Sequence, residues 1–137
     1  MALPDTFTMS RNGARFFASR ILADNVIADT NGVWWDTLQL HPFTIVISGD
    51  WTVADGGGVS IYVSNGVLGY DTQGRAIVSK PADTDNNWPT LGPQLILGPY
   101  GAVSDGPYRW VKVRLSLRAS GTMRAAFSAA TNVGEKG

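Results

Sequence analysis

Catalytic chemistry in this chain would have to start from its single histidine, His41, or from pairs of its aspartates. A Ser-His-Asp site needs a nucleophile and an acid arranged around the histidine, and no Gly-x-Ser-x-Gly motif is present. His41 stands between Leu40 and Pro42 at the expected start of a strand, which favours a structural or surface role. Most aspartates occupy turn-like positions, where a carboxylate binds nearby backbone amides. We therefore expect no catalytic residues and no enzymatic activity.

A second candidate for chemistry is the run Asp83-Thr84-Asp85-Asn86-Asn87, which matches the first, third and fifth ligand positions of a calcium loop. The match then ends, because Trp88 stands where the sharp turn requires glycine and Gln94 where a bidentate glutamate is needed. His41 has no nearby cluster of carboxylates with which to form a metal site. The sequence predicts a polar loop here, with no metal and no cofactor.

The five tryptophans, Trp34, Trp35, Trp51, Trp88 and Trp110, are the residues most open to a binding role. In a strand, adjacent Trp34 and Trp35 must point to opposite faces, so we expect one in the core and the other exposed or at an interface. An exposed ring suits a protein contact, and it could equally stack on a sugar or on single-stranded nucleic acid. The alternative for most of these rings is that they cover the edges of the core.

Charge is balanced overall but uneven along the chain, with eleven basic and eleven acidic side chains. Residues 1–107 carry five basic groups against ten aspartates, a balance of −5, and residues 108–137 carry six against Glu135, a balance of +5. Either neighbouring strands pair these charges within one fold, or the basic part meets an acidic partner. Overall neutrality argues against bulk attraction to nucleic acid or membrane.

Cysteine is absent, which excludes disulfides and thiolate zinc sites and suits a protein made and assembled in a reducing cytosol. No apolar run approaches the roughly 20 residues that span a bilayer. Residues 1–10 also lack the basic start and apolar run of a secretory signal. We expect a protein made in the cytoplasm that does not cross a membrane.

The elements that must position these residues are strands, because turn formers are abundant and strong helix formers are scarce. In Tyr108–Arg118, apolar residues alternate with Lys112, Arg114, Ser116 and Arg118, which predicts a strand with one basic face that Trp110 shares. A turn at 119–122 and renewed alternation over 123–129 then predict a terminal β-hairpin.

Further strands are expected at 43–48 and 59–64, with 67–70 pairing back after Asn65-Gly66. Asn31-Gly32 suggests another hairpin between 26–29 and 33–38. The segment 14–22 suits a short helix or a strand, 71–93 is expected to be mainly a polar loop, and 94–97 a strand. The resulting prediction is one all-β domain over 1–137: an antiparallel, jelly-roll-like β-sandwich of seven to nine short strands, with 1–10 as a possible extended arm.

Three passages carry a resemblance to small jelly-roll virion proteins of tailed bacteriophages, especially head decoration or cement proteins. They are "FTIVISGDW" with "GGVSIYVS" (43–51 and 57–64), "GPYRWVKVRLS" (106–116) and "SGTMRAAFSAA" (120–130). The likeness is one of pattern and has no diagnostic motif. It implies binding to the major capsid protein, homo-oligomerisation as a dimer or trimer at the capsid surface, and no catalysis.

A decoration protein needs apolar or aromatic anchors and a complementary charged rim. The residues that we expect at such an interface are Leu3, Phe7, Trp35, Trp110, Lys112, Arg114, Arg118 and Arg124. The alternatives are a tail or fibre-associated structural protein and a carbohydrate-binding β-sandwich module.

Overall fold

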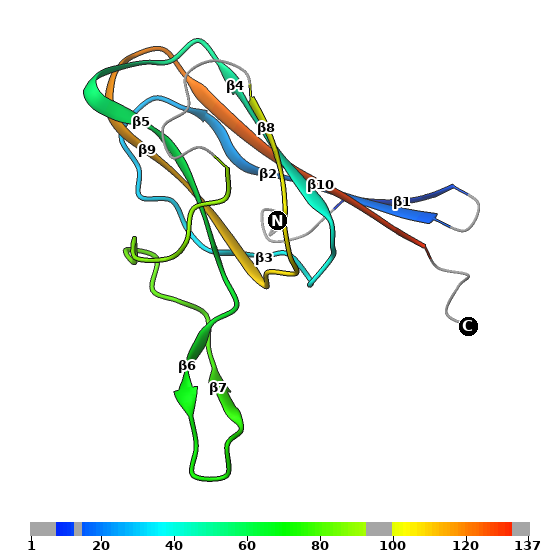
Figure 1. Cartoon of the computed structure of the whole chain (residues 1–137). Helices are drawn as coiled ribbons and strands as arrows, with labels where there is room; N and C mark the ends of the chain where they lie inside the picture. Colours follow the sequence, from blue (N-terminus) through cyan, green and yellow to red (C-terminus); the bar gives the residue numbers. More distant parts are fainter. Residues whose placement is uncertain (1–7, 13–14, 93–99, 133–137) are drawn as a thin grey trace, which may run out of the picture.

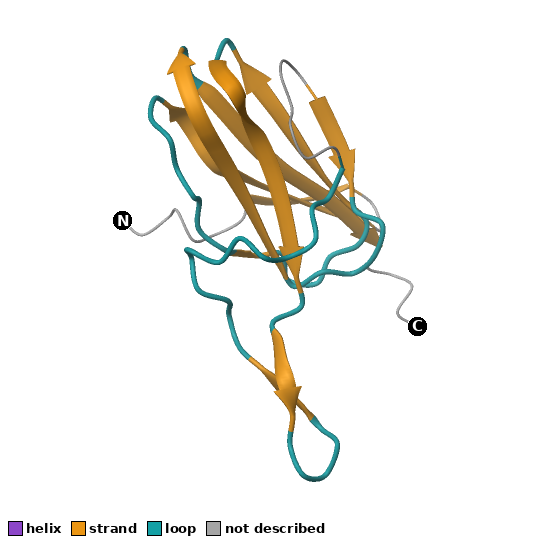
Figure 2. Cartoon of the chain, turned by 60° about the vertical axis from the view of Figure 1, so that its left-hand side comes forward, coloured by secondary structure: helices purple, strands orange, loops and turns teal. Residues whose placement is uncertain are grey.

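The computed structural model describes residues 8–12, 15–92 and 100–132, and within them the chain forms strands and no helix (Figures 1 and 2). No helix that is long and apolar enough to cross a membrane occurs in these residues. The strands are β1 (Thr8–Asn12), β2 (Arg15–Val26), β3 (Trp35–Asp36), β4 (Phe43–Gly49), β5 (Thr52–Ser64), β6 (Val67–Tyr70), β7 (Ala76–Val78), β8 (Tyr100–Val103), β9 (Trp110–Ser120) and β10 (Met123–Asn132).

Two antiparallel sheets face each other, which confirms the predicted all-β sandwich. One sheet has the order β1-β2-β10-β4-β8 and the other β3-β9-β5, while β6 and β7 form a separate two-stranded ribbon (Figure 1). The core between the sheets is built from alternate residues of β4, β5, β9 and β10, the spacing that period-2 strands impose. Its innermost side chains include Phe43, Ile45, Ile61, Leu115 and Phe127.

The predicted terminal hairpin of β9 and β10 is wrong, although both strands are present. β9 pairs with β3 and β5, whereas β10 pairs with β2 and β4 in the other sheet. Both strands turn an apolar face to the same core, so the connection at Gly121 crosses from one sheet to the other. Alternation along β9 also breaks at Leu117, which has a φ of 52° and is 47% exposed. Pattern alone cannot distinguish a hairpin from such a crossover.

Other local pairings also differ from the sequence predictions. The segment after β2 makes a bridge from Thr30 to Leu115 instead of a hairpin with 33–38. β6 pairs with β7, which lies inside the predicted 71–93 loop, and not with the preceding β5. The ambiguous segment 14–22 falls largely within β2. The strand expected at 94–97 lies outside the described residues.

Asp50 connects the end of β4 to the start of β10 by hydrogen bonds. Its Oδ1 accepts hydrogen bonds from the Thr122 amide at 2.9 Å and the Thr122 hydroxyl at 3.3 Å, and its own amide donates to Thr122 O at 3.1 Å. The bond from the Thr122 amide is the main reason that the pKa of the Asp50 carboxyl lies below its usual 3.8. Ionised Asp50 therefore stabilises the fold above about pH 4, and this contribution is lost as the pH falls through its folded-state pKa.

We expect Asp50→Asn to reduce the acid sensitivity of the fold, since the amide oxygen still accepts these bonds but does not titrate. The measurement is the melting temperature at pH 7 and at pH 3 for the wild type, Asp50→Asn and the control Asp55→Asn, which changes an exposed carboxylate on β5. The drop between the two pH values should be smaller in Asp50→Asn than in the other two. An equal drop in all three proteins contradicts the prediction.

Candidate interaction site

A two-stranded hairpin, β6–β7, projects beyond one end of the sandwich (Figures 1 and 2). At its base, Gly66 has a φ of 74°, and its carbonyl accepts a hydrogen bond from the Ser79 amide at 2.8 Å. A Cβ at Gly66 would lie 2.3 Å from Ser79 O, so the base requires glycine. The Asn65 side chain accepts the Arg109 amide at 3.0 Å and ties this base to β9. Asn65-Gly66 is thus the point at which the chain leaves the sandwich, and it does not form the predicted tight turn between two paired strands.

The tip of the hairpin is organised by Asp71. Its Oδ1 accepts the amides of Gln73 and Arg75, both at 2.9 Å, and its Oδ2 lies 3.0 Å from Arg75 Nε. These bonds, the Arg75 amide first, hold the pKa of the Asp71 carboxyl below its usual 3.8. Gly74, with a φ of 81°, completes the turn. The hairpin is therefore closed by specific bonds at both ends.

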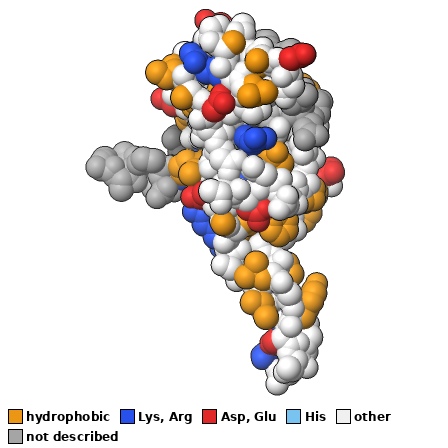
Figure 3. All heavy atoms as spheres, turned by 90° about the vertical axis from the view of Figure 1, so that its left-hand side faces the viewer, with side chains coloured by type: hydrophobic (Ala, Val, Ile, Leu, Met, Phe, Trp, Pro, Cys, Tyr) orange, Lys and Arg blue, Asp and Glu red, His pale blue; other side chains and the backbone are white. Residues whose placement is uncertain are grey.

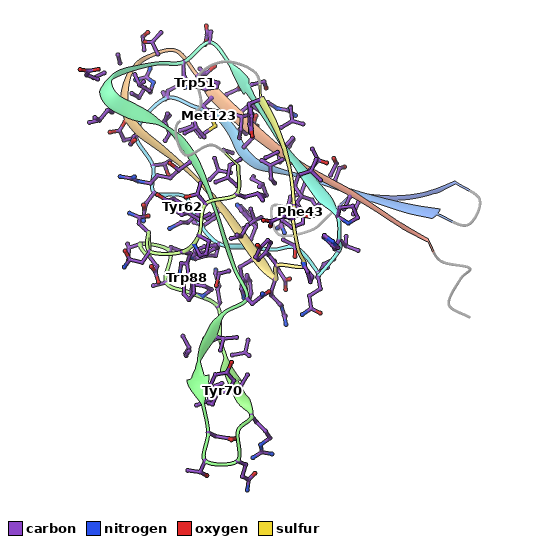
Figure 4. All side chains as sticks on the ribbon, in the orientation of Figure 1. Phe43, Trp51, Tyr62, Tyr70, Trp88 and Met123 are labelled. Atoms are coloured by element: carbon purple, nitrogen blue, oxygen red, sulfur yellow. The ribbon has the colours of Figure 1, made fainter. Side chains whose placement is uncertain are left out.

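The two strands of this hairpin carry large apolar side chains that are exposed to solvent. The most exposed are Tyr70 at 68%, Leu68 at 63% and Val78 at 52%, with Ile77 at 47% and Val67 at 36%. Figure 3 shows apolar side chains along the projection, and Figure 4 shows Tyr70 far from the sandwich core. An isolated two-stranded hairpin is marginal in water, and contiguous exposed apolar patches mark interaction sites. The hairpin has the composition of a docking element.

A second exposed surface lies on the five-stranded sheet, on the side away from the core. We call it the open face. Of its ten residues, five are serine, threonine or arginine and five are apolar or glycine, so this face is less polar than the exposed side of an antiparallel sheet usually is only along one row. Ile21, Ala126, Val46 and Gly101 are in register across β2, β10, β4 and β8. The open face consists of Ser19, Ile21, Thr44, Val46, Ser48, Gly101, Val103, Arg124, Ala126 and Ser128.

Lys112, predicted for an exposed basic face, is fully buried, and that prediction is wrong. Its ammonium donates to the carbonyls of Asp83, at 3.1 Å, and Asp85, and to Asn86 Oδ1 at 3.3 Å. The segment 83–87, which the sequence analysis compared with a calcium loop, therefore surrounds the ammonium group of Lys112. Desolvation lowers the pKa of Lys112 below its usual 10.5, an effect opposed by the Asp85 and Asp83 carboxylates. The segment 82–91 covers this face of the β3-β9-β5 sheet. The alternation of residues within β9 could not reveal that this face is covered.

The remaining predicted cations do not form one face. Arg114 and Arg118 are half-buried on β9, and Arg118 Nε donates to Gly121 O at 2.7 Å. Arg124 is exposed on the other sheet, in the open face. Arg109 pairs with Asp36 at 3.2 Å, so basic groups from the end of the chain meet aspartates from its first part. Separation of β9 and β10 into different sheets is the reason that these charges are dispersed.

None of the five tryptophans presents a fully open ring. Trp34 and Trp51 are buried, and the other three are half-buried. The Arg20 guanidinium lies 4.0 Å above the Trp35 ring, and that of Arg109 lies 5.3 Å from the Trp110 ring. Trp35 and Trp110 are therefore each partly buried, with a guanidinium near the ring. Leu3 and Phe7 lie outside the described residues.

The imidazole of His41 lies beside a serine hydroxyl. Its Nδ1 lies 3.1 Å from Ser104 Oγ, but that oxygen is buried and already accepts the Phe43 amide at 2.9 Å. Ser104 Oγ is thus a buried atom that already binds the backbone of β4. The contact instead ties the start of β4 to the end of β8. The described residues contain no group of three or more metal-ligating side chains.

No protein-family model, curated protein or solved structure gives a significant match.

Sequence reasoning missed the hairpin as an interaction site, although a signal for it was present. Apolar residues at 67–70 and 76–78 flank the turn formers Asp71 and Gly74, which is the pattern of a short hairpin. The open face gave no comparable signal. It exists only because four strands from distant parts of the sequence lie side by side.

Proposed function

We propose that this protein is a structural virion protein of a tailed bacteriophage, which binds and stabilises the capsid shell as a decoration or cement protein. It is made in the host cytoplasm, acts at the capsid surface without catalysis, and contacts the major capsid protein and neighbouring copies of itself. A tail or fibre-associated structural role is the second candidate, since it would use the same kind of protein contact.

The observation that carries this proposal is the β6–β7 hairpin, which exposes five large apolar side chains beyond the end of the sandwich. Both its base and its tip are fixed by hydrogen bonds, so it is built as an ordered projection. Such a surface gains free energy when a neighbouring protein covers it, at about 1.5–3 kcal/mol for each large side chain fully buried. Binding to assembled subunits in preference to separate ones stabilises a shell by mass action.

The carbohydrate-binding alternative has less support. A sugar-binding sandwich needs an open aromatic face, and the five tryptophans are buried or half-buried. Tyr70 is exposed, but its neighbours on the hairpin are aliphatic, which favours a protein partner.

The test is co-sedimentation of the purified chain with phage heads that lack it. We expect saturable binding at a fixed ratio to the major shell protein. The double variant Leu68→Ser/Tyr70→Ser should bind about 100–10,000-fold more weakly, because two anchors worth about 1.5–3 kcal/mol each are lost. The matched control Thr72→Ser/Gln73→Asn changes polar positions of the same hairpin and should bind as the wild type does. Absence of saturable binding by the wild type refutes the capsid role, and binding to isolated tails instead establishes the second candidate.

A further inference from the structure

We infer that a small polar pocket beside β9 receives the carboxylate side chain of a glutamate or aspartate from a partner protein, with Arg114 as its ion-pair partner. This inference deepens the proposed function, on which it rests only for the identity of that partner as the capsid shell. The pocket itself can be tested on the purified chain, without phage heads.

The pocket lies where the segment 29–31 runs alongside β9. It has a volume of about 180 Å³. Sites for drug-sized ligands are larger, at roughly 300–1,000 Å³, so this pocket suits a single side chain. The residues that line it are Asp29, Thr30, Asn31, Arg114, Leu115 and Ser116.

The walls of the pocket are fixed by hydrogen bonds within the chain. The Thr30 amide donates to Leu115 O at 3.0 Å, and the Leu115 amide donates to Thr30 O at 2.9 Å. The Asp29 carboxylate accepts the amides of Leu117 at 3.1 Å and Arg118 at 2.7 Å. A site that is already ordered costs little conformational entropy when a ligand enters it.

Arg114 brings a positive charge that nothing in the described residues neutralises. Its guanidinium is half-buried and forms no hydrogen bond or ion pair in this part of the chain. Burial is the main cause of the lowered pKa of Lys112, and the charge of Arg114 lowers that pKa further, so a second cation lies nearby. A guanidinium presents its N–H donors as a planar fork that matches a carboxylate. The ligand chemistry that Arg114 lacks is therefore that of a carboxylate.

Two acceptors on the opposite wall favour a polypeptide over a phosphate. Both oxygens of Asp29 accept one amide each and keep a further lone pair. Asn31 donates from Nδ2 to Asp83 O at 2.9 Å, and its Oδ1 accepts no hydrogen bond from the described residues. Phosphate has more negative charge and few donors, so Asp29 would repel it. An acidic residue brings one negative charge for Arg114 and a backbone N–H for Asp29 or Asn31.

The position of the pocket agrees with the proposed contact of the hairpin. The pocket belongs to the β3-β9-β5 sheet, and the chain continues from β5 directly into the β6–β7 hairpin. Figure 3 views the molecule from the side on which β5 and β9 lie in Figure 1, and the hairpin extends from the sandwich in the same view. A partner on this side meets both features. The apolar hairpin would then supply affinity, and the ion pair would fix the orientation of the partner.

The first test titrates the isotopically labelled protein with N-acetylglutamate amide and follows the Nε–H resonance of Arg114 by NMR. We expect a saturable shift with a dissociation constant in the millimolar range, since a single side chain supplies the contact. Neutral N-acetylglutamine amide and inorganic phosphate should each bind at least tenfold more weakly. Absence of a saturable shift overturns the inference, and phosphate binding as tight as that of the carboxylate probe overturns the choice of a polypeptide ligand.

The role of Arg114 is tested by Arg114→Gln, which should bind the same probe at least tenfold more weakly. Arg114→Lys keeps the charge but loses the planar fork, and it should fall between the two. The matched control Arg124→Gln changes an exposed arginine of the other sheet and should bind as the wild type does. Unchanged melting temperatures show that the variants are folded. Equal binding by Arg114→Gln and the wild type contradicts the proposed ion pair.

Co-sedimentation of the same variants with phage heads distinguishes the two proposals. We expect Arg114→Gln to bind heads at least tenfold more weakly, and Arg124→Gln to bind them as the wild type does. If Arg114→Gln saturates heads as well as the wild type does, the shell is not the source of the carboxylate, and the capsid role stands. If the chain binds the probe through Arg114 but does not bind heads, the capsid role is refuted and the pocket stands.

Discussion

Replacement of Lys112 by methionine will lower the free energy of unfolding by about 3 kcal/mol, because hydrogen bonds to a buried charged group are worth about 1.5–3 kcal/mol each and water restores only part of them. Lys112 is fully buried and its ammonium binds three oxygens of the segment 83–86. Methionine keeps the apolar stem, so the loss reports mainly on these bonds. Urea unfolding at pH 7 measures it.

A matched control is available in Lys80, which lies 3.8 Å from Asp83 but is half exposed. Surface ion pairs of this kind contribute about 0–1 kcal/mol, so Lys80→Met should have little effect. Hydrogen exchange provides a second readout, since Lys112→Met should speed exchange of the Leu91 amide, which donates to Ile61 O at 2.7 Å. Equal stability losses in the two lysine variants would show that burial of Lys112 does not stabilise this loop.

Replacement of Trp34 by alanine will lower the free energy of unfolding by about 3–5 kcal/mol, the range for large aromatic truncations in a packed interior. Trp34 is 2% exposed, its Nε1 donates to Ala82 O at 2.9 Å, and its ring lies 5.0 Å from Lys112 Nζ. Trp34→Phe keeps most of the ring and loses this hydrogen bond, so it should cost about 1 kcal/mol. The difference between the variants separates ring packing from the hydrogen bond.

Trp34 and Lys112 support the same segment, and their effects should therefore not add. We expect the double variant Trp34→Ala/Lys112→Met to lose less than the two single losses combined, with a coupling energy of about 0.5–3 kcal/mol. Urea denaturation of the four proteins of this cycle measures the coupling. Simple additivity would mean that the ring and the ammonium act on 82–91 independently. Head binding is a useful companion measurement, because neither residue is exposed and neither change should alter it directly.

The strands were the most predictable part of the molecule. Alternation in 43–48, 59–64 and 111–115 depends only on the two faces of an extended chain, and these segments do form β4, β5 and β9. The pairing of these strands was less predictable. Alternation indicates which residues of a strand face the core, but it does not indicate which other strand is its neighbour in the sheet. For that reason β9 and β10 were predicted as a hairpin, although they lie in different sheets.

The candidate site was predicted less well than the fold. Lys112 lies at one of the alternating polar positions of β9, and it is buried only because the segment 82–91 packs over that strand. Arg114 and Arg124 are near in sequence but lie on different sheets. The hairpin residues Leu68 and Tyr70 resemble ordinary strand residues until the structure shows that no sheet covers them in the described part of the chain.

The amino-acid sequence alone determined an all-β domain without disulfides, balanced in charge and rich in turns. These properties are local, since propensity, period-2 patterning and composition act within a few residues. Tertiary structure alone decided which strands share a sheet, that Lys112 is enclosed by carbonyl oxygens, and that a row from Ile21 to Gly101 forms one surface. Such features depend on contacts between residues 27 to 105 positions apart, and packing of the whole chain selects among the many pairings that local patterns allow.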